Sequence, residues 1–450
     1  MKLTFCGASR EVTGSCYVLE TATKKMVIDC GLFQGQRIAE QQNFEDFPFD
    51  PASIDVLFIT HAHLDHCGRI PKLVRDGFRG RIIATKPTAR LAQLILEDSV
   101  DILEHEARRH QHEPIFSLED FEQTVTQFEE TSYRTPITLD SDTTVEFFDA
   151  GHILGSSSIR ITAEGKSIVF SGDLGNCPAP ILNSTDMIGE ADYIVMESTY
   201  GGRTHEDKKT RTLLLQSAIY EIATMKGVLM IPAFAMERTQ ELLFELNNLT
   251  NNKDIPPVPI FLDSPLAIKA TEVFRDSIEY FNLETQEIIR KGDDIFQFPN
   301  LHNTLTPQES KKIHDIPAPK IIIAGSGMAQ GGRIVHHIED YISFFANQYL
   351  IVGFQVNGSL GRRLLEGKKE ISVNGKPFPV KAKVRAIGAY SAHADQNALL
   401  KWVGGFNQKQ LRKIFITHGE EEQAEILAGN IRQVVQADVS IPELFSSVDL

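Results

Sequence analysis

The sequence predicts an α/β fold with two globular domains. Its 450 residues and 42% apolar content are enough to bury more than one core. Short runs of β-branched and aromatic residues, bounded by Gly, Asp and Pro, are typical of strands, and longer amphipathic stretches between them indicate helices. Beyond about residue 200, helices and strands alternate regularly, and this alternation predicts parallel βαβ units.

The first part of the chain is predicted to form sheets that helices cover. Amphipathic stretches at 88–109 and 117–129 indicate the helices. The predicted strands are 2–6, 15–20, 25–31, 54–63, 81–85, 145–152, 158–164, 167–173 and 193–199. A mixture of this kind indicates sheets packed against helices.

The second part follows a different pattern, and the residues alone place a domain boundary near 200. Predicted helices are 208–225, 236–250, 265–290, 395–403 and 421–436, and predicted strands are 227–234, 257–263, 320–327, 383–390 and 412–419. A hairpin is predicted at 371–380.

Composition narrows the class of protein. No apolar stretch has the length of a signal peptide or a membrane span, so we expect a cytoplasmic protein without membrane contact. The five cysteines form no CxxC pair, which favours reduced thiols. The net charge of −15 argues against a generally basic nucleic-acid surface. A polyanionic substrate would therefore need local features such as bound metal ions, helix N-termini and a few arginines.

The strongest motif is HAHLDH at 61–66, which begins at the end of a predicted strand. Side chains of extended backbone repeat every second residue, so His61 and His63 face one side and can share a metal ion. Asp65 and His66 lie where the chain turns into a helix, and the turn allows them to face a neighbouring ion. Imidazole and carboxylate ligands suit zinc better than calcium or magnesium.

Further ligand-type residues lie at the ends of other predicted strands. These residues are His152, Asp173 and His418. Any one of them could be a cap or a satisfied core group, but the repeated placement favours metal ligation. Asp29, at the end of another strand, is predicted to orient a ligand histidine from behind.

The order of Asp29, the HxHxDH motif, His152 and Asp173 resembles the metallo-β-lactamase superfamily. Later motifs resemble its β-CASP nucleases, the group of the cleavage and polyadenylation endonuclease subunit and bacterial RNase J. Glu197 in MESTYGGRTHED resembles motif A, His393 in GAYSAHADQ motif B, and His418 in ITHGE motif C.

The resemblance implies a site and an architecture. It implies two zinc ions per chain, one held by His61, His63 and His152, the other by Asp65, His66 and His418, with Asp173 between them. The implied fold is an αββα sandwich with an inserted parallel-sheet β-CASP domain. The expected segments are 1–204 for the first part of the sandwich, 205–380 for the insertion and 381–450 for the return.

The chemistry that the resemblance implies is hydrolysis of a phosphodiester by a hydroxide that the two metals hold. His393 would be the general acid for the leaving oxygen, with Glu197 hydrogen-bonded to it, and Asp65 would serve catalysis as a ligand. The Gly-rich turn before a predicted helix, with Ser326, Gly327 and Arg333, is expected to bind phosphate, as is Arg362. 

The residue at motif C helps to distinguish RNA from DNA substrates. Relatives that act on DNA usually carry valine there, and RNA-processing relatives carry histidine. His418 therefore predicts an RNA substrate, and the expected protein is a zinc-dependent ribonuclease of RNA processing or decay. A DNA nuclease, a small-molecule metallo-hydrolase and a non-catalytic RNA-binding scaffold stay open. The sequence also leaves open a homodimer and protein partners that add specificity.

Overall fold

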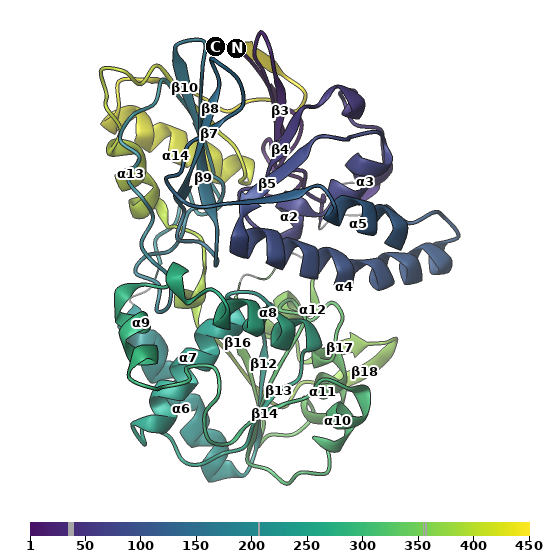
Figure 1. The fold of residues 1–450 in the computed structure, drawn as a ribbon. Coiled ribbons are helices and arrows are strands. Elements are labelled where there is room, and N and C mark those ends of the chain that lie inside the picture. Colours follow the sequence, from purple (N-terminus) through teal and green to yellow (C-terminus); the bar gives the residue numbers. More distant parts are fainter. Residues whose placement is uncertain (35–39, 206–207, 354, 356–357) are drawn as a thin grey trace. The chain divides into compact units, whose positions relative to one another are not determined.

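The chain folds as two compact units, here called unit 1 (Met1–Thr204 with His393–Leu450) and unit 2 (His205–Ala392). The computed structural model describes residues 1–34, 40–205, 208–353, 355 and 358–450. Figure 1 shows both ends of the chain in unit 1, where the last strand pairs with the first. None of the described helices is long and apolar enough to cross a membrane.

Unit 1 contains two seven-stranded mixed sheets. The first has the order β22 (Ser447–Asp449), β1 (Lys2–Phe5), β2 (Tyr17–Glu20), β3 (Lys25–Ile28), β4 (Val56–Phe58), β5 (Arg81–Thr85), β6 (Phe128–Thr131). The second has the order β21 (Asp438–Ser440), β20 (Lys413–Ile416), β11 (Tyr193–Met196), β10 (Lys166–Phe170), β9 (Ser157–Ala163), β8 (Thr144–Asp149), β7 (Ile137–Thr138). Because the chain's last fifth supplies three of these strands, unit 1 is not continuous in sequence.

Apolar side chains hold the two sheets of unit 1 face to face. Phe5 and Phe58 of the first sheet share one buried cluster with Phe147, Phe170 and Phe415 of the second. Helices cover the outer faces: α2 (Leu64–Cys67), α3 (Ile70–Arg75), α4 (Lys86–His110) and α5 (Leu118–Val125) on one, α13 (Gln396–Gly404) and α14 (Glu421–Val434) on the other (Figure 1). Two 3-10 turns, η1 (Gln42–Phe44) and η2 (Pro51–Ser53), lie in the connections. These layers confirm the predicted αββα sandwich.

Unit 2 is built on a parallel sheet, as the alternating pattern predicted. Its strand order is β14 (Leu301–Asn303), β13 (Ile260–Leu262), β15 (Lys320–Ala324), β12 (Val228–Pro232), β16 (Gln348–Ile351), β19 (Lys383–Ala386), and every described pair is parallel. Its helices are α6 (Lys208–Met225), α7 (Arg238–Asn251), α8 (Pro265–Arg275), α9 (Leu283–Arg290), α10 (Pro307–Lys312), α11 (Ile334–Tyr341) and α12 (Leu360–Leu365), with η3 (Ile278–Tyr280) and η4 (Gly388–Tyr390). The predicted hairpin is present as β17 (Glu370–Val373) and β18 (Lys376–Pro379).

Two predicted helices were too long. The 117–129 stretch ends as a helix at Val125, and its last residues enter β6. The 265–290 stretch divides into α8, η3 and α9, because Asn282 accepts a hydrogen bond from the Thr285 amide at 2.8 Å and begins a new helix there. Apolar periodicity continues across both breaks, so a pattern alone could not reveal them.

The compact units divide at 204/205 and 392/393, whereas the sequence placed the end of the insertion at 380. The difference arises from β19, which pairs in parallel with β16 and so belongs to the unit 2 sheet. The chain returns to unit 1 at His393. This residue forms an isolated antiparallel β-bridge with Gly175 of unit 1.

Candidate metal centre

The HAHLDH segment changes direction at His63. The buried strand β4 ends at Phe58, and His63 still has extended backbone dihedrals (φ −71°, ψ 147°) as the N-cap of α2. Asp65 and His66 then lie inside the short helix. His61 and His63 therefore precede the helix, and Asp65 and His66 lie within it. This change from extended backbone to helix is the one that the sequence predicted.

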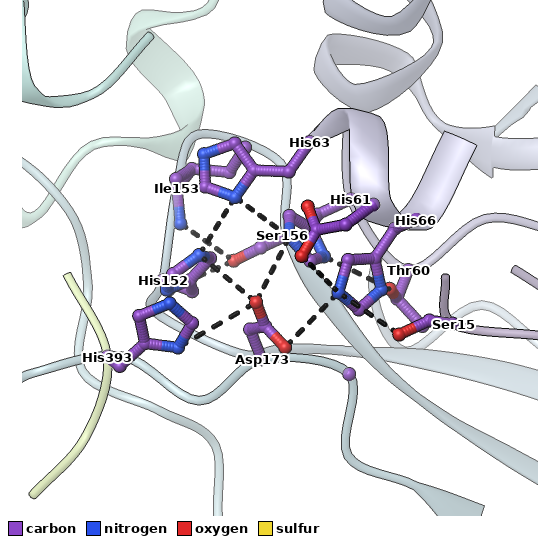
Figure 2. Close-up of polar contacts among 12 residues, drawn as sticks. Ser15, Thr60, His61, His63, His66, His152, Ile153, Ser156, Asp173 and His393 are labelled. Atoms are coloured by element: carbon purple, nitrogen blue, oxygen red, sulfur yellow. Dashed lines mark hydrogen bonds and ion pairs between the residues drawn. The ribbon is translucent and has the colours of Figure 1, made fainter. Parts of the chain in front are cut away.

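The other predicted ligands come from ends of three strands in the second sheet. His152 follows β8, Asp173 follows β10, and His418 follows β20. Figure 2 shows His61, His63, His66, His152 and Asp173 pointing toward one another. The fold thus brings the predicted ligand side chains between positions 61 and 418 into one cluster, in which only His63 and Asp65 are partly exposed.

Four atoms form the first ligand group: His61 Nε2, His63 Nδ1, His152 Nε2 and Asp173 Oδ2. His63 Nδ1 lies 3.1 Å from His61 Nε2 and 3.2 Å from His152 Nε2. Asp173 Oδ2 lies 3.4 Å from His61 Nε2 and 3.6 Å from His152 Nε2. Zinc–nitrogen bonds of 2.0–2.1 Å in a tetrahedron give edges of about 3.3–3.4 Å, which these separations match.

The second ligand group contains Asp65, His66 and His418. His418 Nε2 lies 3.1 Å from His66 Nε2 and 3.3 Å from Asp65 Oδ2, and the remaining separation is 3.9 Å. Asp173 Oδ1 lies 3.3 Å from His66 Nε2, so the two oxygens of Asp173 face different groups. The carboxylate is placed to be shared between two neighbouring cations.

The chemistry of the cluster fits bound cations. Both oxygens of Asp173 are buried, yet no donor in the described part of the chain hydrogen-bonds to either. Leaving a buried carboxylate without donors is costly unless a cation compensates it. Burial lowers the pKa of His61 to about 3 and that of His63 to about 4, so both imidazoles stay neutral and keep a lone pair for a metal.

Asp29 supports the cluster from behind. It accepts hydrogen bonds from the Thr60 amide, the Thr60 hydroxyl and His66 Nδ1, each at 2.8 Å. With Nδ1 occupied in this way, Nε2 of His66 faces His418 and Asp173. Burial lowers the pKa of His66, but Asp173 and Asp29 outweigh burial and raise it above the usual value.

Two threonines in similar positions were missed by the sequence interpretation. Thr60 Oγ1 lies 3.1 Å from His61 Nδ1, and Thr199 Oγ1 lies 3.2 Å from His418 Nδ1. Each hydroxyl therefore contacts the ring nitrogen that faces away from the neighbouring imidazole. In the sequence, Thr60 directly precedes His61 and Thr199 is two residues after Glu197. These positions were the only signal that could have identified the two threonines.

Two glycines allow the ligand-bearing loops to approach closely. A Cβ atom on Gly31 would lie 1.6 Å from the Asp65 carbonyl oxygen, and one on Gly175 would lie 1.7 Å from the Gly151 carbonyl oxygen. Any side chain at Gly31 would displace the α2 segment, and any side chain at Gly175 would displace the loop that carries His152.

His393 and Glu197 lie beside the first ligand group. His393 Nδ1 is 3.3 Å from Glu197 Oε2 and 3.7 Å from Asp173 Oδ2, and its ring centroid is 4.6 Å from that of His152. The Leu174 amide donates to Glu197 Oε1 at 2.6 Å, which fixes the carboxylate. Burial lowers the pKa of His393, but the carboxylates of Glu197 and Asp173 outweigh it and raise that pKa to about 9.

The predicted phosphate ligands all belong to unit 2, and their side chains are engaged locally. Arg333 donates to Asp263 Oδ1 at 2.7 Å and to the carbonyl oxygens of Thr304 and Leu305. Arg362 donates to Glu366 at 2.8 Å. Ser326 and Gly327 lie in the turn after β15, where Ser326 Oγ donates to the Gly331 carbonyl oxygen at 3.3 Å. Arg333 therefore connects the segments that follow β13 and β14. The Gly-rich pattern did not predict this structural role.

Sequence models of known families match most of the chain. Residues 9–194 match the metallo-β-lactamase superfamily, 239–364 the β-CASP domain, and 377–442 the RNA specificity domain of Zn-dependent metallo-hydrolases. The fold and its buried His/Asp cluster therefore place the protein among the metallo-β-lactamase-fold hydrolases. Within that class, the chain belongs to the β-CASP family.

Individual relatives agree over nearly the full length. Ribonuclease TTHA0252 of Thermus thermophilus is 34% identical over 94% of this chain and 94% of its own. The RNase J-like protein of Methanocaldococcus jannaschii is 30% identical, covering 98% and 97%. Transcription termination factor FttA of Methanosarcina mazei is 29% identical, covering 96% and 69%. A protein of unknown function from Enterococcus faecalis V583 shares the fold, with a TM-score of 0.59, 11% identity and coverage of 100% and 99%.

Proposed function

We propose that this chain is a ribonuclease that uses two zinc ions to hydrolyse phosphodiester bonds of RNA, in RNA processing or decay. The observation that carries the proposal is the position of Asp173, which offers one oxygen to each of two adjacent ligand groups. A single-metal or purely structural site would not need this arrangement.

His61, His63 and His152 would hold one zinc ion, Asp65, His66 and His418 the other, with Asp173 contributing to both. The nitrogen-rich donor set and its separations of 3.1–3.6 Å in the first group support zinc over a hard, oxygen-preferring cation. When bound, the two ions supply an acidified water and neutralise negative charge on the phosphorus centre.

The chain's own residues then account for positioning and proton transfer. Asp29 and Thr60 hold the ligand rings, and Glu197 holds the ring of His393 through Nδ1. We assign His393 as the general acid that protonates the leaving 3′ oxygen, following the β-CASP motif that it matches. Its position beside Asp173 and His152, outside both metal-ligand groups, supports that role.

RNA is the proposed substrate for three reasons. The model that matches residues 377–442 is described as an RNA specificity domain, and relatives covering nearly the whole chain are named ribonucleases. The third reason is His418 at the position where DNA-specific relatives usually carry valine. These features favour RNA over DNA and over a small-molecule ester.

The test compares matched RNA and DNA strands, each labelled at either end, with purified protein of measured zinc content. We expect about two zinc ions per chain, cleavage of RNA and none of DNA. Asp65→Ala should abolish cleavage, and Asp46→Ala, a change at an exposed aspartate of unit 1, should leave it unchanged. Stepwise shortening would indicate an exonuclease and one internal product an endonuclease.

Three results would overturn the proposal. RNA that decays equally with wild type and Asp65→Ala would exclude this centre as the source of cleavage. Equal cleavage of DNA would favour a DNA nuclease, and a protein that binds RNA but holds no zinc would favour a scaffold.

A further inference from the structure

A concentrated basic segment of unit 2 contrasts with the acidic chain around it. Residues 362–385 contain eight basic residues and two glutamates, and so carry a charge of +6 in a protein of net charge −15. The basic residues are Arg362, Arg363, Lys368, Lys369, Lys376, Lys381, Lys383 and Arg385. The segment spans α12 and the β17–β18 hairpin of unit 2 (Figure 1).

Only part of this charge is neutralised within the molecule. Arg362 pairs with Glu366, and both Lys383 and Arg385 pair with Glu221. In contrast, no carboxylate in the described ranges lies within ion-pair distance of the exposed Lys368, Lys369 or Lys381. Their charges are available to an external anion.

The hairpin brings these three lysines to one end. Glu370 pairs with Pro379 across the hairpin, and the Val380 amide donates to the Lys369 carbonyl oxygen at 2.8 Å beyond the strand ends. Lys368 and Lys381 are the next residues on the two chains, beyond the paired strands. Like charges therefore gather where the hairpin opens, and an anion bound there would offset their repulsion.

An exposed aromatic ring completes this surface. Phe345 is 73% exposed, and Lys381 Nζ lies 5.7 Å from its ring centroid. The Lys381 amide donates to the Ile342 carbonyl oxygen at 3.0 Å, which fixes the lysine beside the loop that carries Phe345. A large aromatic ring in water beside an ammonium group without a carboxylate partner is a combination that binds single-stranded nucleic acid, where bases stack and phosphates pair.

We propose that Lys368, Lys369, Lys381 and Phe345, here called the basic hairpin surface, form a second RNA contact outside the metal centre. The lysines would pair with phosphates, and Phe345 would stack on one base. The choice of RNA as ligand rests on the proposed function. A flexible single strand can follow a local patch, whereas a flat anionic membrane would also meet the acidic remainder of the protein.

The test uses the full-length holoenzyme and the triple variant Lys368→Gln, Lys369→Gln, Lys381→Gln. The matched control replaces three exposed lysines elsewhere in unit 2, Lys253, Lys269 and Lys291, by Gln, and so removes the same charge. With end-labelled single-stranded RNA, we expect the hairpin variant to raise KM about tenfold at low salt with kcat unchanged. The control should match wild type.

Binding is measured separately by fluorescence anisotropy in an Asp65→Asn background, in which cleavage is absent. The dependence of log affinity on log salt should become shallower by about 2 in the hairpin variant, because each lost single-strand phosphate contact removes about 0.7. Phe345→Ala should weaken binding about fivefold, whereas Phe344→Ala, at a neighbouring exposed ring, should not.

The outcomes separate this inference from the proposed function. Loss of RNA binding by the hairpin variant supports the surface even if wild type proves unable to cleave RNA. If wild type cleaves RNA and the hairpin variant has the same KM and salt dependence, the surface is not an RNA contact. Lost binding to phosphatidylserine vesicles with unchanged RNA affinity would also overturn it, and equal effects of Phe344→Ala and Phe345→Ala would exclude stacking on Phe345.

Discussion

Each unit contains a buried aspartate next to histidine at the end of a strand, and the two aspartates are in opposite states. In unit 2, Asp263 receives four hydrogen bonds from side chains at 2.6–2.7 Å, from Thr304, Arg333, Ser310 and His337. In unit 1, Asp173 is as deeply buried, but neither of its oxygens accepts a hydrogen bond from a described residue.

The difference shows how a structural carboxylate can be distinguished from the proposed metal ligand Asp173. The hydrogen bonds to Asp263 compensate its lost hydration, so this cluster needs no cation. The same hydrogen bonds connect strand ends to α11. Asp173 faces imidazole nitrogens of both candidate ligand groups, and cations bound between them would compensate the carboxylate and accept the lone pairs of those nitrogens. Burial and neighbouring histidine are common to both sites, so the supply of donors is the feature that separates them.

The largest effect is expected from removing Asp173, the proposed shared ligand. Asp173→Asn should lower the rate of RNA cleavage by at least about three orders of magnitude, because both ligand groups lose a charged oxygen. Zinc per chain, measured by mass spectrometry, should fall while circular dichroism shows an intact fold. Full zinc content in this variant would contradict a shared role.

His393→Ala should lower kcat by about 10²- to 10⁴-fold, the usual contribution of a positioned general acid. Zinc content should stay at the wild-type level, because His393 belongs to neither ligand group. Single-turnover cleavage at saturating RNA measures the effect, and an unchanged rate would remove the assigned role.

Asp263→Ala should have the reverse profile, with zinc retained and stability reduced. Removing the carboxylate leaves Arg333 and the buried His337 without their partner, which costs about 3–5 kcal/mol of unfolding free energy for a buried pair. Urea unfolding measures the loss, and Ser310→Ala, which removes one hydrogen bond, should cost only about 1 kcal/mol. If Asp263→Ala lost zinc and kept its stability, the structural role assigned to Asp263 would be contradicted.

A smaller effect is expected behind the metal centre. Asp29→Asn should weaken zinc binding about 10- to 100-fold, because the amide orients His66 less strongly than the carboxylate does. Competition with a chromogenic chelator measures the affinity. Thr23→Ala, at an exposed hydroxyl of unit 1, provides a control that should bind zinc as wild type does.

The smallest effect concerns acid stability. Burial raises the pKa of Asp263, but hydrogen bonds from His337, Ser310, Thr304 and Arg333 outweigh burial and hold it below the usual range. A depressed carboxylate pKa stabilises the fold above about pH 4 and loses that contribution as the pH falls further. Asp263→Asn should therefore flatten the fall in urea-unfolding free energy below pH 4, and an unchanged slope would contradict this.

Local patterns predicted the layers of the fold well and the element ends less well. Strand alternation, the parallel series after residue 200 and the αββα arrangement expected from the family motifs are all present. The breaks before α9 and after α5 were missed, because apolar periodicity continues across both and the hydrogen bond from the Thr285 amide to Asn282 that begins α9 forms only in the folded chain. The side-chain partner of Arg333 was not foreseen for a similar reason, since Asp263 lies 70 residues away in the sequence.

The sequence by itself determined that imidazole and carboxylate groups follow strand ends at 61–66, 152, 173 and 418, and that a β-CASP domain interrupts the sandwich. Only the tertiary structure decided that Asp173 accepts no hydrogen bond from a described residue and faces two candidate ligand groups, that Asp263 accepts four side-chain hydrogen bonds, and that Lys381 lies beside the ring of Phe345. The physical reason is that a side chain's chemistry depends on neighbours brought within about 3–4 Å, and distance along the chain does not specify those neighbours.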